Sequence, residues 1–112
     1  KAKSTAEQWG IGAYYQDYHD LLAHPEVEAV SVTTWPTAHA GPVIAAADLG
    51  KHVLCEKPIA TTLEDADAMV AAAERAGIKL AMGYQPQFGR VWPTVRVFPI
   101  SLCHSRFVAR WF

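Results

Sequence analysis

The chain has 112 residues, which suffices for one ordinary domain or part of a larger protein and is too few for two full domains. Hydrophobic residues make up 51% of it and charged residues 19%, a balance that supports a packed core and excludes intrinsic disorder and low-complexity repeats. Ten Lys and Arg residues against eleven Asp and Glu residues give a net charge of −1, so no overall field draws the protein to nucleic acid or to a membrane surface.

The signals for a cellular compartment favour the cytoplasm. No window approaches the about 20 consecutive apolar residues of a membrane span, and residues 1–7 lack the apolar stretch of a signal peptide. Cys55 and Cys103 are too few for a disulfide framework and too far apart for a CxxC metal clip, so we expect free thiols. We therefore expect a cytoplasmic protein with no membrane and no nucleic acid among its partners.

Two short helices are predicted near the amino terminus. Residues 1–9 favour the first, which ends at Gly10, and a very short strand is predicted over residues 13–15. Asp17 is the candidate N-cap of a second helix over residues 17–23, because its carboxylate can accept hydrogen bonds from the free amides at a helix start.

Three strands are predicted over residues 27–34, 52–55 and 78–83. Their unbroken apolar and β-branched composition is typical of strands buried on both faces of a parallel sheet. Helical segments lie between them, and no two- to five-residue hairpin turn does, so the strands are expected to be parallel neighbours in a right-handed α/β fold.

The two helices between these strands have recognisable ends. The first, over residues 37–49, ends at Gly50, and the second opens with a capping box of Thr61 and Glu64 and ends at Gly77. Their expected buried faces are Val43, Ile44 and Ala47 in the first, and Leu63, Ala66, Met69, Val70 and Ala73 in the second.

Ligands of parallel sheets bind beyond the carboxyl ends of the strands, which directs attention to residues 33–39, 55–59 and 83–87. The first of these loops sets hydroxyls, an indole and His39 at a helix start, and by itself it favours a capping or packing role for that histidine. In the second loop, Glu56 and Lys57 follow a buried strand directly. They are either a solvated pair in a turn or a means of presenting a fixed cation to a ligand.

Runs of sequence over residues 30–34, 45–58, 72–77 and 83–85, together with His39, form a specific pattern. The central run is Gly50-Lys51-His52-Val53-Leu54-Cys55-Glu56-Lys57-Pro58. Over about residues 2–96 the chain closely resembles the glucose-fructose oxidoreductase and inositol dehydrogenase family (Gfo/Idh/MocA). That run is far less common by chance than a lone glycine fingerprint.

The resemblance implies a Rossmann-type nicotinamide-binding domain followed by an α+β substrate domain, in enzymes that mostly oxidise or reduce sugars, polyols and related compounds. It implies a catalytic Lys57 beside the nicotinamide ribose and the reacting hydroxyl, in a loop held by Glu56 and Pro58. The other cofactor-binding residues that it implies are Thr33, Thr34, Trp35, Pro36, His39 and Gln85. No metal ligand is expected, because a strand over residues 52–55 places His52 and Cys55 on opposite faces.

The chain contains no GxGxxG sequence, and the family's first strand and phosphate loop have no counterpart in it. We therefore expect a partial Rossmann-type parallel sheet with helices on both faces. Residues 1–96 are expected to form the carboxyl-terminal part of a dinucleotide-binding domain. Residues 97–112 are expected to be the start, or an aberrant remnant, of the substrate domain, with a strand over residues 106–112.

The leading functional hypothesis is a fragment of an NAD(P)-dependent dehydrogenase that moves a hydride between nicotinamide and a hydroxyl-bearing carbon of a sugar or polyol. Its cofactor would be NAD or NADP, its partner a small-molecule substrate, and the intact enzyme is expected to be a homo-oligomer. The fragment alone is expected to be inactive. The alternative is a non-catalytic α/β module of the same ancestry that binds a nucleotide or another partner.

Overall fold

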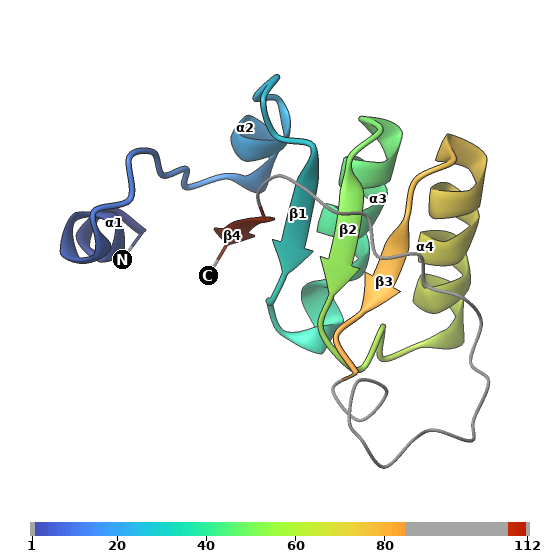
Figure 1. The fold of residues 1–112 in the computed structure, drawn as a ribbon. Helices are drawn as coiled ribbons and strands as arrows, with labels where there is room; N and C mark the ends of the chain where they lie inside the picture. The colour runs from blue at the N-terminus through green and yellow to red at the C-terminus, as the bar shows by residue number, and fades with distance from the viewer. Residues whose placement is uncertain (1, 85–107, 112) are drawn as a thin grey trace, which may run out of the picture.

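The computed structural model describes residues 2–84 and 108–111, in which helices alternate with strands (Figure 1). In chain order the elements are α1 (Ala2–Trp9), α2 (Tyr18–Leu22), β1 (Ala29–Val32), the 3-10 helix η1 (Pro36–Ala38), α3 (Ala40–Asp48), β2 (His52–Cys55), α4 (Leu63–Ala76), β3 (Leu80–Met82) and β4 (Val108–Trp111). None of the helices in these residues combines the length and apolar character needed to cross a bilayer.

The strands form one parallel sheet in the order β3-β2-β1-β4. Val30 of β1 lies opposite Val53 of β2, which lies opposite Leu80 of β3. The parallel pairing of β1, β2 and β3 confirms the α/β prediction. β1 and β3 are shorter than the predicted ranges 27–34 and 78–83, because the four residues of β2 between them limit how far either strand can pair.

β4 lies beside β1, with Val108 opposite Ala29 and Trp111 opposite Val32. It falls within the segment that the sequence predicts as a strand over residues 106–112. The predicted division between residues 96 and 97 lies outside the described residues, so the assignment of two domains stays a prediction.

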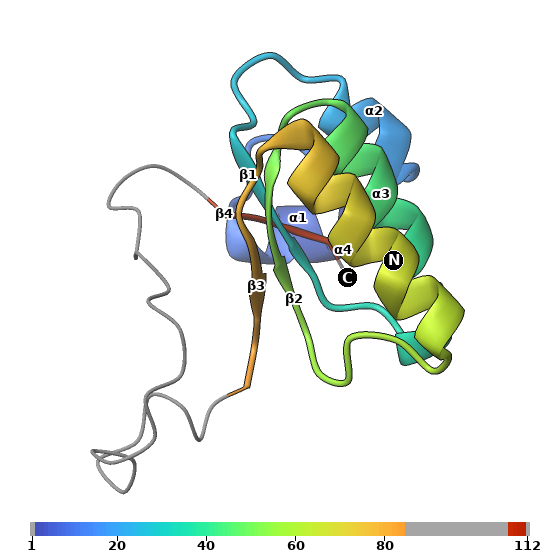
Figure 2. The same ribbon diagram turned by 90° about the vertical axis from the view of Figure 1, so that its right-hand side faces the viewer.

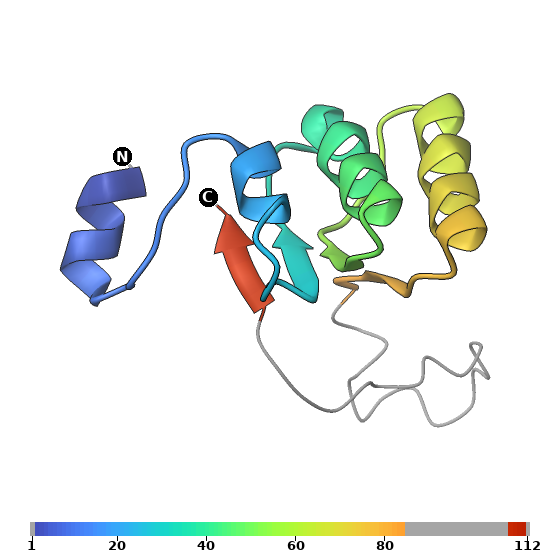
Figure 3. The ribbon, with the colours of Figure 1, turned by 90° about the horizontal axis from the view of Figure 1, so that it is seen from above.

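Helices α2, α3 and α4 cover one face of the sheet (Figures 2 and 3). The helix α1 lies to the side, beyond the β4 edge (Figures 1 and 3). The sequence predicts helices on both faces, whereas in the described residues these three share a single face. The reason is geometric: the chain steps from β1 to β2 to β3 in one direction, and right-handed crossovers then place both connecting helices on the same side.

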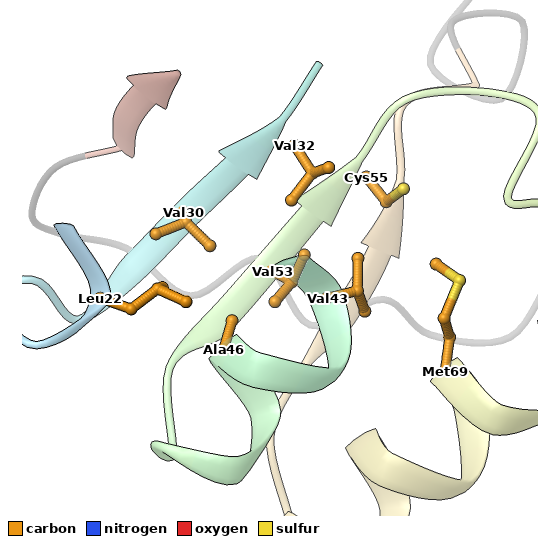
Figure 4. Close-up of a cluster of buried hydrophobic side chains, with 8 residues drawn as sticks. All are labelled: Leu22, Val30, Val32, Val43, Ala46, Val53, Cys55 and Met69. Carbon is orange, nitrogen blue, oxygen red and sulfur yellow. The ribbon is translucent and has the colours of Figure 1, made fainter. Parts of the chain in front are cut away.

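The core lies between this face and the helices (Figure 4). Alternate residues of β1 and β2 point toward the helices, as the two-residue period of a strand requires. The buried cluster consists of Leu22, Val30, Val32, Val43, Ala46, Val53, Cys55 and Met69. This packing holds the carboxyl ends of β1 and β2 at fixed positions.

Two predictions before β2 are corrected. Residues 13–15 form no strand, and Ala13 and Tyr14 are exposed. The helix predicted over residues 37–49 begins at Ala40, because Pro36 starts the separate 3-10 turn of η1. The predicted Asp17 cap is confirmed: its carboxylate accepts a hydrogen bond of 2.8 Å from the amide of His19.

The start of α4 lies one residue later than predicted. Thr62, not Thr61, is the N-cap, and its hydroxyl accepts a hydrogen bond of 3.1 Å from the amide of Asp65. Of the predicted buried face, Met69 and Ala73 are buried, whereas Leu63 and Val70 are exposed. The buried residues of the helix are Met69, Ala72 and Ala73.

Candidate functional site

The loops that follow β1, β2 and β3 leave the sheet at the same edge, as predicted (Figure 1). Backbone hydrogen bonds join the strand exits there. The amide of Glu56 donates to the carbonyl of Val32 at 2.9 Å, and the amide of Gly83 donates to the carbonyl of Cys55 at 2.7 Å. The three exits therefore form a continuous rim, on which most of the candidate residues lie.

The loop after β1 is a tight turn that presents an aromatic side chain. The amide of Ala38 donates to the carbonyl of Trp35 at 2.8 Å, and the hydroxyl of Thr34 donates to the carbonyl of Ala38 at 3.3 Å. The Trp35 side chain is 82% exposed. Of the other candidates here, Thr33 and Pro36 are partly buried.

His39 is fully buried beneath this rim. Its Nε2 lies 3.0 Å from the carbonyl oxygen of Thr34, and its Nδ1 lies 3.0 Å from that of Pro58 and 3.1 Å from that of Ile59. The ring thus links the loop after β1 to the loop after β2. Because the His39 ring is buried, we expect it to hold the two loops in place rather than to contact a cofactor directly.

In the loop after β2, Lys57 is exposed and its backbone is fixed by a neighbouring carboxylate. Oε2 of Glu56 accepts a hydrogen bond of 3.3 Å from the amide of Lys57. The same carboxyl group lies against Gly83, where an added Cβ would stand 3.3 Å from its carbon. The peptide bond between Lys57 and Pro58 is cis. The loop therefore places an ammonium group on a fixed stretch of backbone at the rim.

The thiol of Cys55 is a core group. It is free and fully buried, and burial raises its pKa from 9.0 to about 11, with a smaller contribution from the charge of Glu56. Its Sγ donates to the carbonyl of Glu56 at 3.5 Å. A thiol kept protonated in this way is a poor nucleophile at neutral pH.

A metal centre finds no support in residues 2–84 and 108–111, where no group of three or more His, Cys, Asp or Glu side chains could hold an ion. His52 instead accepts a hydrogen bond at Nδ1 from the amide of Lys79 at 3.1 Å.

Sequence reasoning missed the role of Gly83, although a glycine in or beside a strand often marks a place where another group approaches closely. It also missed the carbonyl of Ile59 as a partner of His39, since backbone contacts between distant loops leave no local signal. Gln85 lies outside the described residues.

The comparisons with known proteins agree with this geometry. Residues 1–84 match the family model of the Gfo/Idh/MocA oxidoreductases, described as an oxidoreductase family with an NAD-binding Rossmann fold. The chain belongs to this family. It is 46% identical over 84 residues to the 1,5-anhydro-D-fructose reductase of Ensifer adhaerens, a match that covers 75% of this chain and 25% of the relative. It is 36% identical over 90 residues to the myo-inositol 2-dehydrogenase of Thermotoga maritima, covering 80% and 27%.

Solved structures of the family have the same fold. The chain superposes on an NAD-binding oxidoreductase from Klebsiella pneumoniae with a TM-score of 0.72 and 35% identity, covering 76% of this chain and 22% of the other. A levoglucosan dehydrogenase in complex with NADH and levoglucosan gives a TM-score of 0.65 and 33% identity, covering 70% and 22%. The chain thus spans about a quarter of the length of the curated relatives it matches.

Proposed function

We propose that this chain is part of an NAD(P)-dependent oxidoreductase that transfers a hydride between nicotinamide and a hydroxyl-bearing carbon of a sugar, a polyol or a related compound. Membership in the family supports the cofactor, and relatives named for anhydrofructose and inositol support the substrate class. The observation that carries the proposal is the exposed Lys57 at the carboxyl edge of a parallel sheet, where α/β proteins bind ligands.

The chemistry of the rim fits a nicotinamide nucleotide. An exposed indole, hydroxyl groups and an ammonium group lie along one edge, and they suit an aromatic ring, ribose hydroxyls and negative charge. The residues proposed to border the cofactor are Thr33, Thr34, Trp35, Pro36, Glu56, Lys57, Pro58 and Gln85, with His39 supporting them. When bound, the cofactor supplies the hydride chemistry itself.

Lys57 is proposed to bind the substrate oxygen. Removing hydride from a carbinol carbon requires the hydroxyl to lose its proton, and negative charge then develops on that oxygen. A preorganised ammonium group stabilises this charge more than it stabilises the neutral hydroxyl, which lowers the barrier. The carboxylate of Glu56 contributes by holding the amide of Lys57, so that the cation need not be ordered at the moment of reaction.

The larger assembly is also part of the proposal. Residues 1–96 would belong to the dinucleotide-binding domain and residues 97–112 to the beginning of the α+β substrate domain. The intact enzyme would act in the cytoplasm as a homo-oligomer.

Substitution of Lys57 tests the proposal in the intact enzyme. Lys57→Ala should lower kcat/KM by roughly 10²- to 10³-fold, the effect of removing one preorganised electrostatic donor. Lys57→Arg should also be impaired, because a planar guanidinium does not replace a compact ammonium group. Since the side chain is exposed, the free energy of unfolding should change by less than about 0.5 kcal/mol.

Lys79→Ala is the matched control, since Lys79 is an exposed lysine that precedes β3 at the opposite edge of the sheet. Steady-state kinetics with a sugar or polyol substrate and denaturant titrations measure both effects. A folded Lys57→Ala enzyme with activity within a few-fold of the parent would overturn the catalytic role of Lys57 and leave Glu56 and Lys57 as a solvated pair in a turn.

A further inference from the structure

His39 is a buried imidazole whose hydrogen-bond partners within the described residues are all acceptors. Three backbone carbonyl oxygens lie within 3.1 Å of its ring nitrogens: that of Thr34 at Nε2, and those of Pro58 and Ile59 at Nδ1. A carbonyl oxygen has no proton to donate, so each of these contacts is a hydrogen bond only if the ring nitrogen carries the proton.

A neutral imidazole cannot satisfy this arrangement. It has one N–H and one bare lone pair, so either tautomer would place a lone pair against a carbonyl oxygen at 3.0 to 3.1 Å with no proton between them. An imidazolium has a proton on each nitrogen and can donate to all three oxygens. Burying the charge carries a cost, which the three charge-assisted hydrogen bonds offset.

We propose that His39 keeps a proton on both ring nitrogens in the folded protein and, as a positioning residue, fixes the backbone that carries Lys57. The second half of this statement rests on the proposed function, because it assigns the purpose of the contact to Lys57. The first half depends on the geometry of the ring alone.

The backbone of Lys57 is held on both sides. Before it, the amide of Glu56 is tied to the carbonyl of Val32 in β1, and the Glu56 carboxylate accepts from the Lys57 amide. After it, both carbonyls of the next two residues are bound by His39, whose other nitrogen is anchored at the loop after β1. Without these donors the carbonyls after Lys57 would be left unpaired or would turn toward water, and the direction of the lysine would be lost.

The titratable groups on the neighbouring elements do not replace the carbonyls as partners. The Glu56 carboxylate is engaged by the amide of Lys57 and lies against Gly83, and the thiol of Cys55 donates to the carbonyl of Glu56. The Lys57 side chain is exposed. Among residues 2–84 and 108–111, the hydrogen-bond contacts of the His39 ring therefore remain those with the three carbonyl oxygens.

Nitrogen NMR measures directly whether each ring nitrogen of His39 carries a proton. The sample is the intact protein, labelled with ¹⁵N at histidine only. We expect both His39 nitrogens to show the shifts of protonated nitrogens at neutral pH. His52 is the internal reference, because its Nδ1 accepts from the Lys79 amide and must be unprotonated. One unprotonated nitrogen in His39 would overturn the proposal. The signal is assigned by elimination, from variants in which each of the other histidines of the intact protein is substituted in turn, so no His39 variant needs to fold.

Kinetics tests the link to Lys57. His39→Gln should lower kcat roughly tenfold with KM within about threefold, because the lost interaction acts in the transition state. In a double-mutant cycle, His39→Gln should lower activity by less than about twofold once Lys57 is already Ala, since coupled residues are not additive. His52→Gln, which alters a ring at the amino edge of β2, should leave both parameters unchanged.

The outcomes separate the two proposals. Additive losses in the cycle, with Lys57→Ala strongly impaired, would overturn the positioning role of His39 and leave the proposed function standing. A fully active Lys57→Ala enzyme would overturn the catalytic role proposed for Lys57 and the purpose assigned to His39, while the NMR result would still decide the protonation of His39.

Discussion

Gly83 supports the site because it has no side chain, which leaves room for the carboxyl group of Glu56. Its φ lies outside the left-handed region, so backbone freedom does not explain a glycine here. The lack of space for a side chain explains it, because an added Cβ would lie 3.3 Å from the carboxyl carbon and from Oε2 of Glu56. That oxygen also accepts from the amide of Lys57, so the glycine, the carboxylate and the lysine form one chain of contacts.

Gly83→Ala is therefore expected to displace the Glu56 carboxylate. We expect a loss of kcat/KM of roughly tenfold, smaller than that for Lys57→Ala because only the support of the cation is disturbed. The free energy of unfolding should fall by about 1 kcal/mol from overpacking. Gly12→Ala is the control, since Gly12 has open space around it and no positive φ. If the Gly83→Ala enzyme has the same kcat/KM as the parent, the position of the Glu56 carboxylate does not affect catalysis.

Not all of the site could be predicted from the sequence. Lys57 was located at the rim because a charged residue directly after a buried strand is conspicuous in the sequence alone. The partners of His39 were not predictable in the same way, because Pro58 and Ile59 are 19 and 20 residues away and contact the ring through their backbones. Local patterns predict which strand end a residue follows, but they do not predict which distant carbonyls meet its side chain.

Among the elements, the helix ends differ in how well the sequence predicts them. Gly50 and Gly77 were predicted as stops and have φ of 69° and 66°, a region that few other residues adopt. The start of α4 was ambiguous, because Thr61 and Thr62 are adjacent and each has an acidic residue three positions later. Only the backbone shows which hydroxyl serves: Thr62 is extended, with φ −128° and ψ 155°.

These two threonines provide a matched pair of variants for α4. Thr62→Ala removes the hydroxyl that accepts from the amide of Asp65, and should lower the free energy of unfolding by about 1 kcal/mol. Thr61→Ala should change it by less than about 0.5 kcal/mol, because that residue is exposed and lies outside the cap. Urea titrations of both variants measure the difference. Equal effects, or a larger effect of Thr61→Ala, would contradict the cap assignment.

On the scale of the whole molecule, the described sheet provides one part of what a dinucleotide needs. A Rossmann-type domain receives the pyrophosphate at a glycine-rich loop that connects a strand to a helix start. The chain contains no GxGxxG sequence. Gly10 and Gly12 do not replace it, because they follow the helix α1 and Gly10 serves as its left-handed stop with φ 63°. Under the proposed function, the loops after β1, β2 and β3 would bind only the nicotinamide end of the cofactor.

Residues 1–112 alone are therefore expected to bind NAD(H) weakly. Because the chain has no GxGxxG sequence to receive the pyrophosphate, only the contacts at the rim would offset the loss of translational and rotational freedom on binding. We expect a dissociation constant well above about 1 μM, the value that corresponds to about −8 kcal/mol. Calorimetry of the isolated chain, after circular dichroism has shown that it is folded, measures this affinity, and the intact enzyme is the positive control. A dissociation constant of about 1 μM or below for the folded chain would mean that the rim alone holds the dinucleotide.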